Sequence, residues 1–154
     1  MDTPLTVRRG RVHDYLGMTL DFSDKGKVRI DMKNYIKKVL KELEHLKNGW
    51  DGTAVTPASE NLYKTNDQSI KLTTVQSESF HHVVAQLLFL CKRARPDIQT
   101  AIAFLTTRVK GPDNDDLQKL KRVIRYLRST VNLVLTLESD NMSTINWWVD
   151  AAFG

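Results

Sequence analysis

The sequence predicts an α+β fold in which a β-hairpin, four helices and a terminal β-hairpin follow one another. Apolar and polar residues alternate over residues 11–22 and 28–32, on either side of a turn-type stretch at 23–26, which predicts the first hairpin. Apolar residues then recur at helical spacing in four segments. The 154-residue chain is 41% hydrophobic and 27% charged, a composition typical of globular proteins.

The first amphipathic helix is expected to begin after Asp31, a favourable capping residue, and to end near Asn48. Residues 49–76 are rich in Gly, Ser, Thr and Asn, and they predict a long connector of the kind that is usually functional or mobile. Three more helices follow, and they are expected to pack as a small bundle. Pro96 suits the first turn of the second of these helices, and Asp113 can cap the third.

The helical spacing also predicts which side chains of the three-helix bundle are buried. The three apolar stripes comprise Phe80, Val83, Val84, Leu87, Leu88 and Cys91, then Ile98, Ala101, Ile102, Leu105 and Val109, then Leu117, Leu120, Val123, Ile124 and Leu127. Cys91 is the single cysteine, and its apolar context predicts a buried, unreactive thiol.

Two strands, at residues 131–137 and 145–150, close the chain and are expected to begin a separate sheet. Nothing follows the second strand to pair with it, and natural domains seldom end on such an edge. We therefore expect a truncated gene or a piece of a longer protein. Asp150 lies at the end of this strand, where exposure to solvent is favoured over metal binding if the residues alone are considered.

The charge of the chain is compatible with a polyanionic partner. Lys and Arg total 23 against 18 Asp and Glu, which gives a net charge of +5 and a pI near 9.4. There is no Gly-rich phosphate loop, no Cys/His metal spacing and no nucleophile elbow, so the sequence predicts no complete active site. No apolar run approaches the length of a membrane span, and the start of the chain lacks the charged-then-apolar pattern of a signal peptide, so we expect no membrane partner and an intracellular location.

Two basic clusters are candidates for contacts with nucleic-acid phosphates: Lys92, Arg93 and Arg95, and then Arg122, Arg125 and Arg128. The second cluster has three-residue spacing, which puts its guanidinium groups on one broad helix face. Two alternatives remain open. The clusters could form a charged solvent face, or the arginines of the second cluster could pair with nearby carboxylates.

Five segments resemble copia-type retrotransposon reverse transcriptases in their order and spacing. Residues 13–18 contain a Tyr-Leu-Gly strand, and residues 80–90 resemble the family's Val-Gly-x-Leu-Leu-Tyr-Leu helix. Residues 94–98 resemble its Thr-Arg-Pro-Asp-Ile signature, and residues 120–130 resemble its Lys-Arg-Ile-Leu-Arg-Tyr-Leu-Lys-Gly-Thr helix. Residues 148–152 resemble the first strand of the attached RNase H domain. The chain departs from the family pattern at Ala85, Ala94 and Ser129.

The resemblance implies three regions. Residues 1–30 would be the late palm, with a primer-grip-like hairpin at Tyr15, Leu16 and Gly17. Residues 31–130 would be a helical thumb and connection, and residues 131–154 the truncated start of an RNase H-like domain. It also implies that Asp150 is the first catalytic, metal-binding carboxylate of RNase H, and that the parent enzyme uses Mg²⁺. No tight Mg²⁺ binding is expected from this chain, because it lacks the polymerase carboxylates and most of the RNase H set.

The expected function is that of a non-catalytic piece of an RNA-directed DNA polymerase. It would hold an RNA–DNA or DNA template-primer duplex by its backbone, with the rest of the retrotransposon polyprotein as a further partner. One alternative is a non-functional retrotransposon remnant. Another is a free-standing helical nucleic-acid-binding module, against which the acidic start of the last helix argues.

Overall fold

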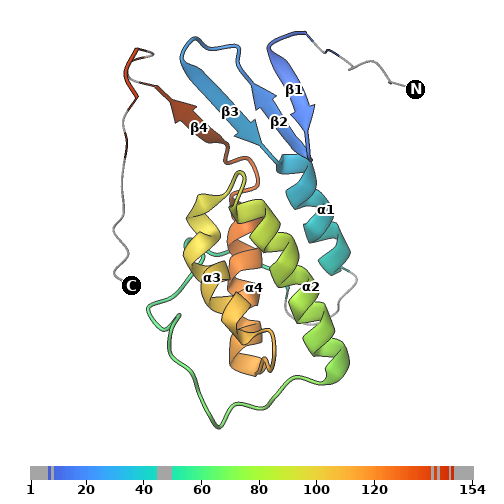
Figure 1. Ribbon diagram of the computed structural model, residues 1–154. Helices are drawn as coiled ribbons and strands as arrows, with labels where there is room; N and C mark the ends of the chain where they lie inside the picture. The colour runs from blue at the N-terminus through green and yellow to red at the C-terminus, as the bar shows by residue number, and fades with distance from the viewer. Residues whose placement is uncertain are drawn as a thin grey trace, which may run out of the picture.

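The computed structural model describes residues 7, 9–44, 50–139, 141, 143–145 and 147. A four-stranded antiparallel sheet lies at one end of the molecule, and the helices lie below it in the view of Figure 1. The predicted α+β class is confirmed, and so is the order of hairpin, helix, connector and three helices; of the predicted terminal hairpin, the described residues contain the strand at Leu135–Glu138.

The sheet contains β1 (Val12–Tyr15), β2 (Met18–Asp21), β3 (Lys27–Asp31) and β4 (Leu135–Glu138), hydrogen bonded in that order. The first strand expected at residues 11–22 is therefore two strands.

A two-residue turn at Leu16 and Gly17 divides this expected strand. Their φ angles are 49° and 79°, as a type I′ hairpin turn requires at both central positions. Tyr15 is paired with Met18 across the turn, so both side chains lie on one face. Apolar and polar residues alternate through the turn without a break, so the alternation alone does not show where β1 ends. Gly17 is a residue type typical of turns and could have indicated the position.

Strand β4 was expected to start a separate sheet, but it extends the first one. It is antiparallel to β3, with Ile30 opposite Leu135 and Val28 opposite Leu137. The pairing brings these four apolar side chains together on one face of the sheet, and contacts between such cross-strand pairs stabilise a sheet. Of residues 145–150, the structure describes only Ile145 and Trp147, neither of which is in a strand, and Asp150 lies outside the described residues.

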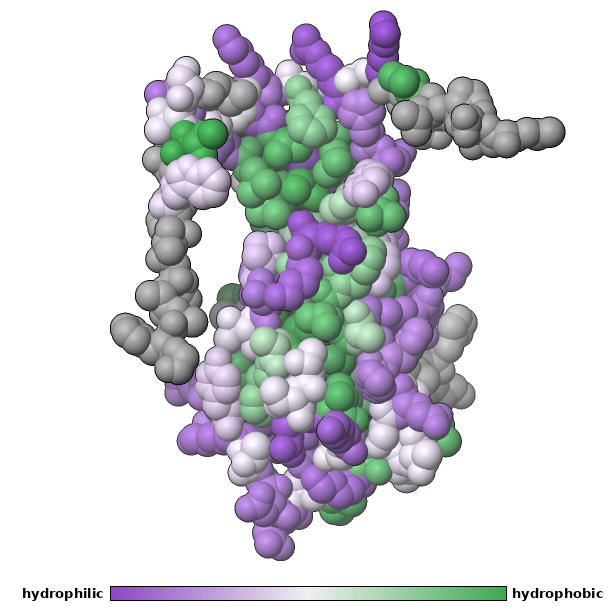
Figure 2. Space-filling view, in the orientation of Figure 1, coloured by the Kyte–Doolittle hydropathy of each residue, from purple (hydrophilic) through white to green (hydrophobic). Residues whose placement is uncertain are grey.

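One face of the sheet is apolar and largely open. Hydrophobic atoms gather over it in Figure 2, and the pairing places Leu20, Val28, Ile30, Leu135 and Leu137 on that face. Among these five, Ile30 packs against the main core, whereas Leu137 is half exposed.

The helices are α1 (Lys33–Glu44), α2 (Thr74–Cys91), α3 (Gln99–Arg108) and α4 (Asn114–Ser129), with a short 3₁₀ turn at Pro96–Ile98 before α3. The predicted caps are present, because Asp31 accepts a hydrogen bond from the Lys33 amide and Asp113 accepts from the amides of Asp115 and Asp116. Helix α2 begins three residues earlier than expected, with a capping box between Thr73 and Gln76. None of the helices in the described part is long and apolar enough to cross a membrane.

The predicted core stripes of α2, α3 and α4 are buried, except that Leu88, Val109 and Leu117 are partly buried. The connector, defined as residues 50–72, is polar as predicted but contributes three apolar side chains to the core. Its Trp50, Leu62 and Leu72 are buried in the same core. The connector therefore packs against the helices.

Cys91 is buried as predicted, and burial raises the pKa of its thiol. Because the thiolate is the reactive form, we expect reaction with an aromatic disulfide reagent at pH 8 to be limited by opening of the structure. The native chain should react at least about a hundredfold more slowly than the chain unfolded in urea. Equal rates in the two conditions would contradict this placement of the thiol.

Candidate nucleic-acid interface

The face of α4 that carries the second basic cluster lies against the connector. Arg125 donates from Nε to the Asp51 carbonyl oxygen at 2.8 Å, and Arg128 donates from Nη2 to the Trp50 carbonyl oxygen at 3.4 Å. The Ser129 hydroxyl donates to the Ala54 carbonyl oxygen at 2.8 Å. Ser129, one of the departures from the family pattern, therefore helps to hold the connector.

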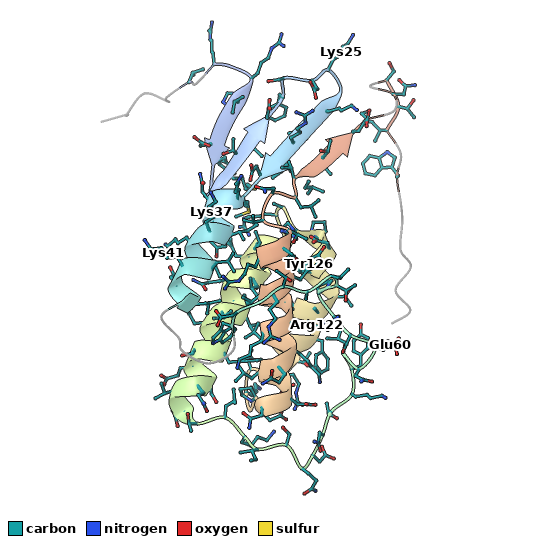
Figure 3. All side chains as sticks on the ribbon, turned by 180° about the vertical axis from the view of Figure 1, so that it is seen from behind. Lys25, Lys37, Lys41, Glu60, Arg122 and Tyr126 are labelled. Atoms are coloured by element: carbon teal, nitrogen blue, oxygen red, sulfur yellow. The ribbon has the colours of Figure 1, made fainter. Side chains whose placement is uncertain are left out.

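Arg122 lies one turn before Arg125 in the sequence of α4, and Figure 3 labels it on this helix, seen from behind. Its Nη2 donates to the Thr56 hydroxyl oxygen at 2.9 Å. Its Nε is buried and has no hydrogen-bond partner in the described structure, and the same holds for the Nε of Arg128.

The hydrogen-bond partners of Arg122 and Arg128 are a hydroxyl and a carbonyl oxygen, which leave the guanidinium charge in place. The nearby carboxylates have other cationic partners. Asp116 pairs with Arg108 at 3.0 Å, Glu138 with Lys27 at 2.9 Å, and Asp115 lies 4.0 Å from Lys119. The α4 face therefore keeps positive charge while its side chains are held in place.

A pocket of about 490 Å³ lies between α4 and the connector. Four cationic side chains and one carboxylate line it: Lys64, Lys119, Arg122, Arg125 and Asp115. This cavity could not be found from the sequence, because it depends on how the connector crosses the helix.

Arg95 was expected at the nucleic-acid surface, and the structure corrects this. Its side chain is 1% exposed. Nε and Nη2 donate to the two carboxylate oxygens of Asp97 at 3.0 and 2.7 Å, while Nη1 and Nη2 donate to the carbonyl and hydroxyl oxygens of Thr130 at 3.0 and 2.7 Å. A buried guanidinium needs such a full set of acceptors. Arg95 links the end of α2 to the end of α4 and is not accessible to a phosphate.

The carboxylate of Asp97 responds to this contact. Burial raises the pKa of Asp97, but hydrogen bonds from Arg95 and Tyr126 and the charge of Arg95 together outweigh burial and hold it below its ordinary value. The ionised pair is therefore the stable form of the contact at neutral pH.

Lys92 and Arg93, the other two members of the first cluster, differ in exposure and in their contacts. Lys92 is exposed, whereas the guanidinium of Arg93 lies 3.6 Å from the centre of the Phe89 ring. Phe89 in turn contacts Tyr35 of α1, with ring centres 5.3 Å apart. The described contacts of Arg93 thus involve α2, and those of the α4 arginines involve the connector.

The primer-grip-like residues form the tip of the β1–β2 hairpin. Tyr15 and Leu16 are 59% and 58% exposed. Gly17 shares a small pocket with Lys33 and Asn34 at the start of α1, so the tip lies beside that helix.

The structure does not test the expected metal site. Asp150 lies outside the described residues. Within the described part of the chain, no three or more His, Cys, Asp or Glu side chains gather in a way that could hold a metal ion. The assignment of Asp150 and the requirement of the parent enzyme for Mg²⁺ stay predictions.

These elements define a small α+β unit in which a cationic helix face is held against a connector. The chain is 30% identical over 148 residues to a Saccharomyces cerevisiae protein described as "Putative transposon Ty5-1 protein YCL074W". The match covers 94% of this chain and 46% of the yeast protein, so the chain spans about half the length of that relative. No protein-family model and no solved structure matches the chain. The similarity supports a retrotransposon origin.

Proposed function

We propose that the chain is a non-catalytic part of a copia-type reverse transcriptase that holds a template-primer duplex by its backbone. The observation that carries this proposal is the α4 face, where Arg122 and Arg128 are positioned by neutral oxygen atoms and keep their charge. The similarity to a transposon protein and the family-like segments of the sequence support it as well.

Binding through this face would be independent of base sequence, because phosphate contacts position a protein without reading bases. The start of α4 carries Asp115 and Asp116 in its first turn, and carboxylates there disfavour insertion of this helix end into a groove. A non-functional transposon remnant is the second candidate, which the similarity to a putative transposon protein supports equally.

We expect weak, salt-sensitive binding of the chain to RNA–DNA and DNA duplexes. A plot of the logarithm of the association constant against the logarithm of the salt concentration should have a slope of about −2 to −3, the value expected for two or three phosphate contacts. Fluorescence anisotropy of a labelled duplex at several salt concentrations measures the slope. Absence of binding at low salt would favour the remnant, and strong preference for one sequence would contradict backbone recognition.

Two double variants separate the α4 face from the rest of the charged surface. The double variant Arg122→Gln/Arg128→Gln should reduce the magnitude of the salt slope by about two units, since each lost phosphate contact removes about one unit. Lys37→Gln with Lys41→Gln removes the same charge from the exposed face of α1 and should flatten it less. Circular dichroism checks that both variants are folded, and a larger effect of the lysine variant would place the interface elsewhere.

A further inference from the structure

Two contacts tie the connector to α4 beside the pocket that lies between them. At one end Arg122 binds the Thr56 hydroxyl, whose own proton goes to the Ala58 carbonyl oxygen at 2.8 Å. At the other end the Lys119 ammonium donates to the Lys64 carbonyl oxygen. The connector between these contacts lines the cavity, which therefore has fixed walls rather than being a gap along a loose loop.

The electrostatic character of the pocket favours an anion. Four of its lining side chains are cationic and one is anionic. The single carboxylate, Asp115, is about half exposed and lies 4.0 Å from Lys119, whose side chain is 12% exposed. Asp115 can offset one of the four positive charges, so the cavity retains a positive potential into which an oxyanion would be drawn.

Arg122 supplies a donor that lacks an acceptor. Its Nε is buried and has no hydrogen-bond partner in the described structure, although its Nη2 is bonded to Thr56. An unpaired donor of this kind shows that the protein alone does not complete the hydrogen bonds of the Arg122 guanidinium. Because Nε is closed to solvent, the terminal nitrogens of this pocket-lining guanidinium are the donors that a phosphate oxygen would meet.

We propose that this pocket binds the phosphate group of a nucleotide, either free or within a nucleic-acid strand. The assignment of a nucleotide rests on the proposed function, whereas the preference for phosphate rests on the pocket itself. A volume of about 490 Å³ exceeds the needs of one phosphate group and lies within the range of small-molecule sites. Ala54, Pro57 and Leu62 also line the pocket and provide apolar contacts for a sugar or a base.

Isothermal titration of the full chain with pyrophosphate and with dATP at low salt tests the proposal. Arg122→Gln should weaken binding of both probes by about tenfold or more, because a hydrogen bond to a charged group contributes about 1.5–3 kcal/mol. Lys41→Gln is the matched control, since it removes the same charge from the exposed surface of α1 and should change affinity less than about twofold.

Lys64→Gln is a second pocket variant that cannot disturb the core, because Lys64 is an exposed residue of the connector. It should weaken both probes more than Lys41→Gln does, and urea unfolding shows whether each variant keeps its stability. The proposal is overturned if neither probe binds the wild-type chain. It is equally overturned if the pocket variants and the Lys41 control lose affinity alike, since binding would then follow net charge alone.

A labelled duplex distinguishes the two sources of phosphate and separates this proposal from the previous one. Displacement of the duplex by pyrophosphate assigns the pocket to a strand phosphate. Binding of pyrophosphate without displacement assigns it to a free nucleotide. If the duplex does not bind but pyrophosphate does, the duplex-holding function fails and the assignment of the pocket stands. If the duplex binds Arg122→Gln with unchanged affinity, the strand source of the phosphate fails, and so does the part of Arg122 in the proposed duplex-holding face.

Discussion

Replacement of Arg95 by Ala is expected to lower the free energy of unfolding by about 3–5 kcal/mol, the loss typical of removing one partner from a buried ion pair. The guanidinium is almost fully buried and satisfies oxygens of Asp97 and Thr130. The substitution would leave these acceptors without their donor and would open a cavity beneath Tyr126, whose ring centre lies 5.6 Å from the guanidinium carbon. Urea unfolding followed by circular dichroism measures the loss.

Lys92→Ala provides the control for this experiment. Lys92 lies three residues before Arg95 but is exposed, so removing its charge should change the free energy of unfolding by less than about 0.5 kcal/mol. Arg95→Lys should recover only part of the stability, because an ammonium cannot form the forked contact with Asp97. If Arg95→Ala and Lys92→Ala destabilised the chain equally, the buried network would have no special role.

The helical core could be predicted from the sequence because its apolar residues repeat at the helical period over two turns or more. Phe80, Ile102 and Leu120 lie on such stripes and are buried as expected. The pattern could not report the role of Arg95, because a basic residue at a helix end is usually solvated. Only its contacts across the bundle, with Thr130 at a separation of 35 residues, reveal why it is inside.

The candidate interface was predictable in part for a similar reason. The three-residue spacing of Arg122, Arg125 and Arg128 correctly indicated one helix face. What covers that face depends on the connector, whose buried Trp50 and Leu62 are isolated apolar residues in a polar stretch without periodicity. Contacts of this kind, more than 60 residues apart in the chain, are set by tertiary packing and not by local pattern.

Asp113 joins three elements at the other end of the bundle. Its Oδ1 caps α4 by accepting from the amides of Asp115 and Asp116, each at 3.0 Å. Its Oδ2 accepts from Arg108 of α3 at 3.3 Å and lies 3.7 Å from the ammonium of Lys71 in the connector. The sequence indicated the cap, whereas the two ion pairs emerge only from the packed structure.

Asp113→Ala is expected to lower the free energy of unfolding by about 2–4 kcal/mol, since it removes both a helix cap and hydrogen bonds to a charged partner. Asp113→Asn should lose less at pH 7, because asparagine caps a helix as well as aspartate does. The difference between the two variants therefore isolates the cap, and the difference between wild type and Asp113→Asn isolates the charge. Urea unfolding of the three chains measures both differences.

The charge contribution of Asp113 should disappear in acid. Burial raises the pKa of Asp113, but hydrogen bonds from the Asp116 and Asp115 amides and the charges of Lys71 and Arg108 together outweigh it, so the folded pKa lies below the ordinary value. Ionised Asp113 thus stabilises the fold above its unfolded pKa of about 3.9, and this stabilisation is lost as the pH falls through the lower folded pKa. Asp113→Asn cannot titrate, so the advantage of wild type should shrink steadily below about pH 4. An advantage that stays constant from pH 7 to pH 2 would show that the ionised carboxylate of Asp113 contributes nothing to stability.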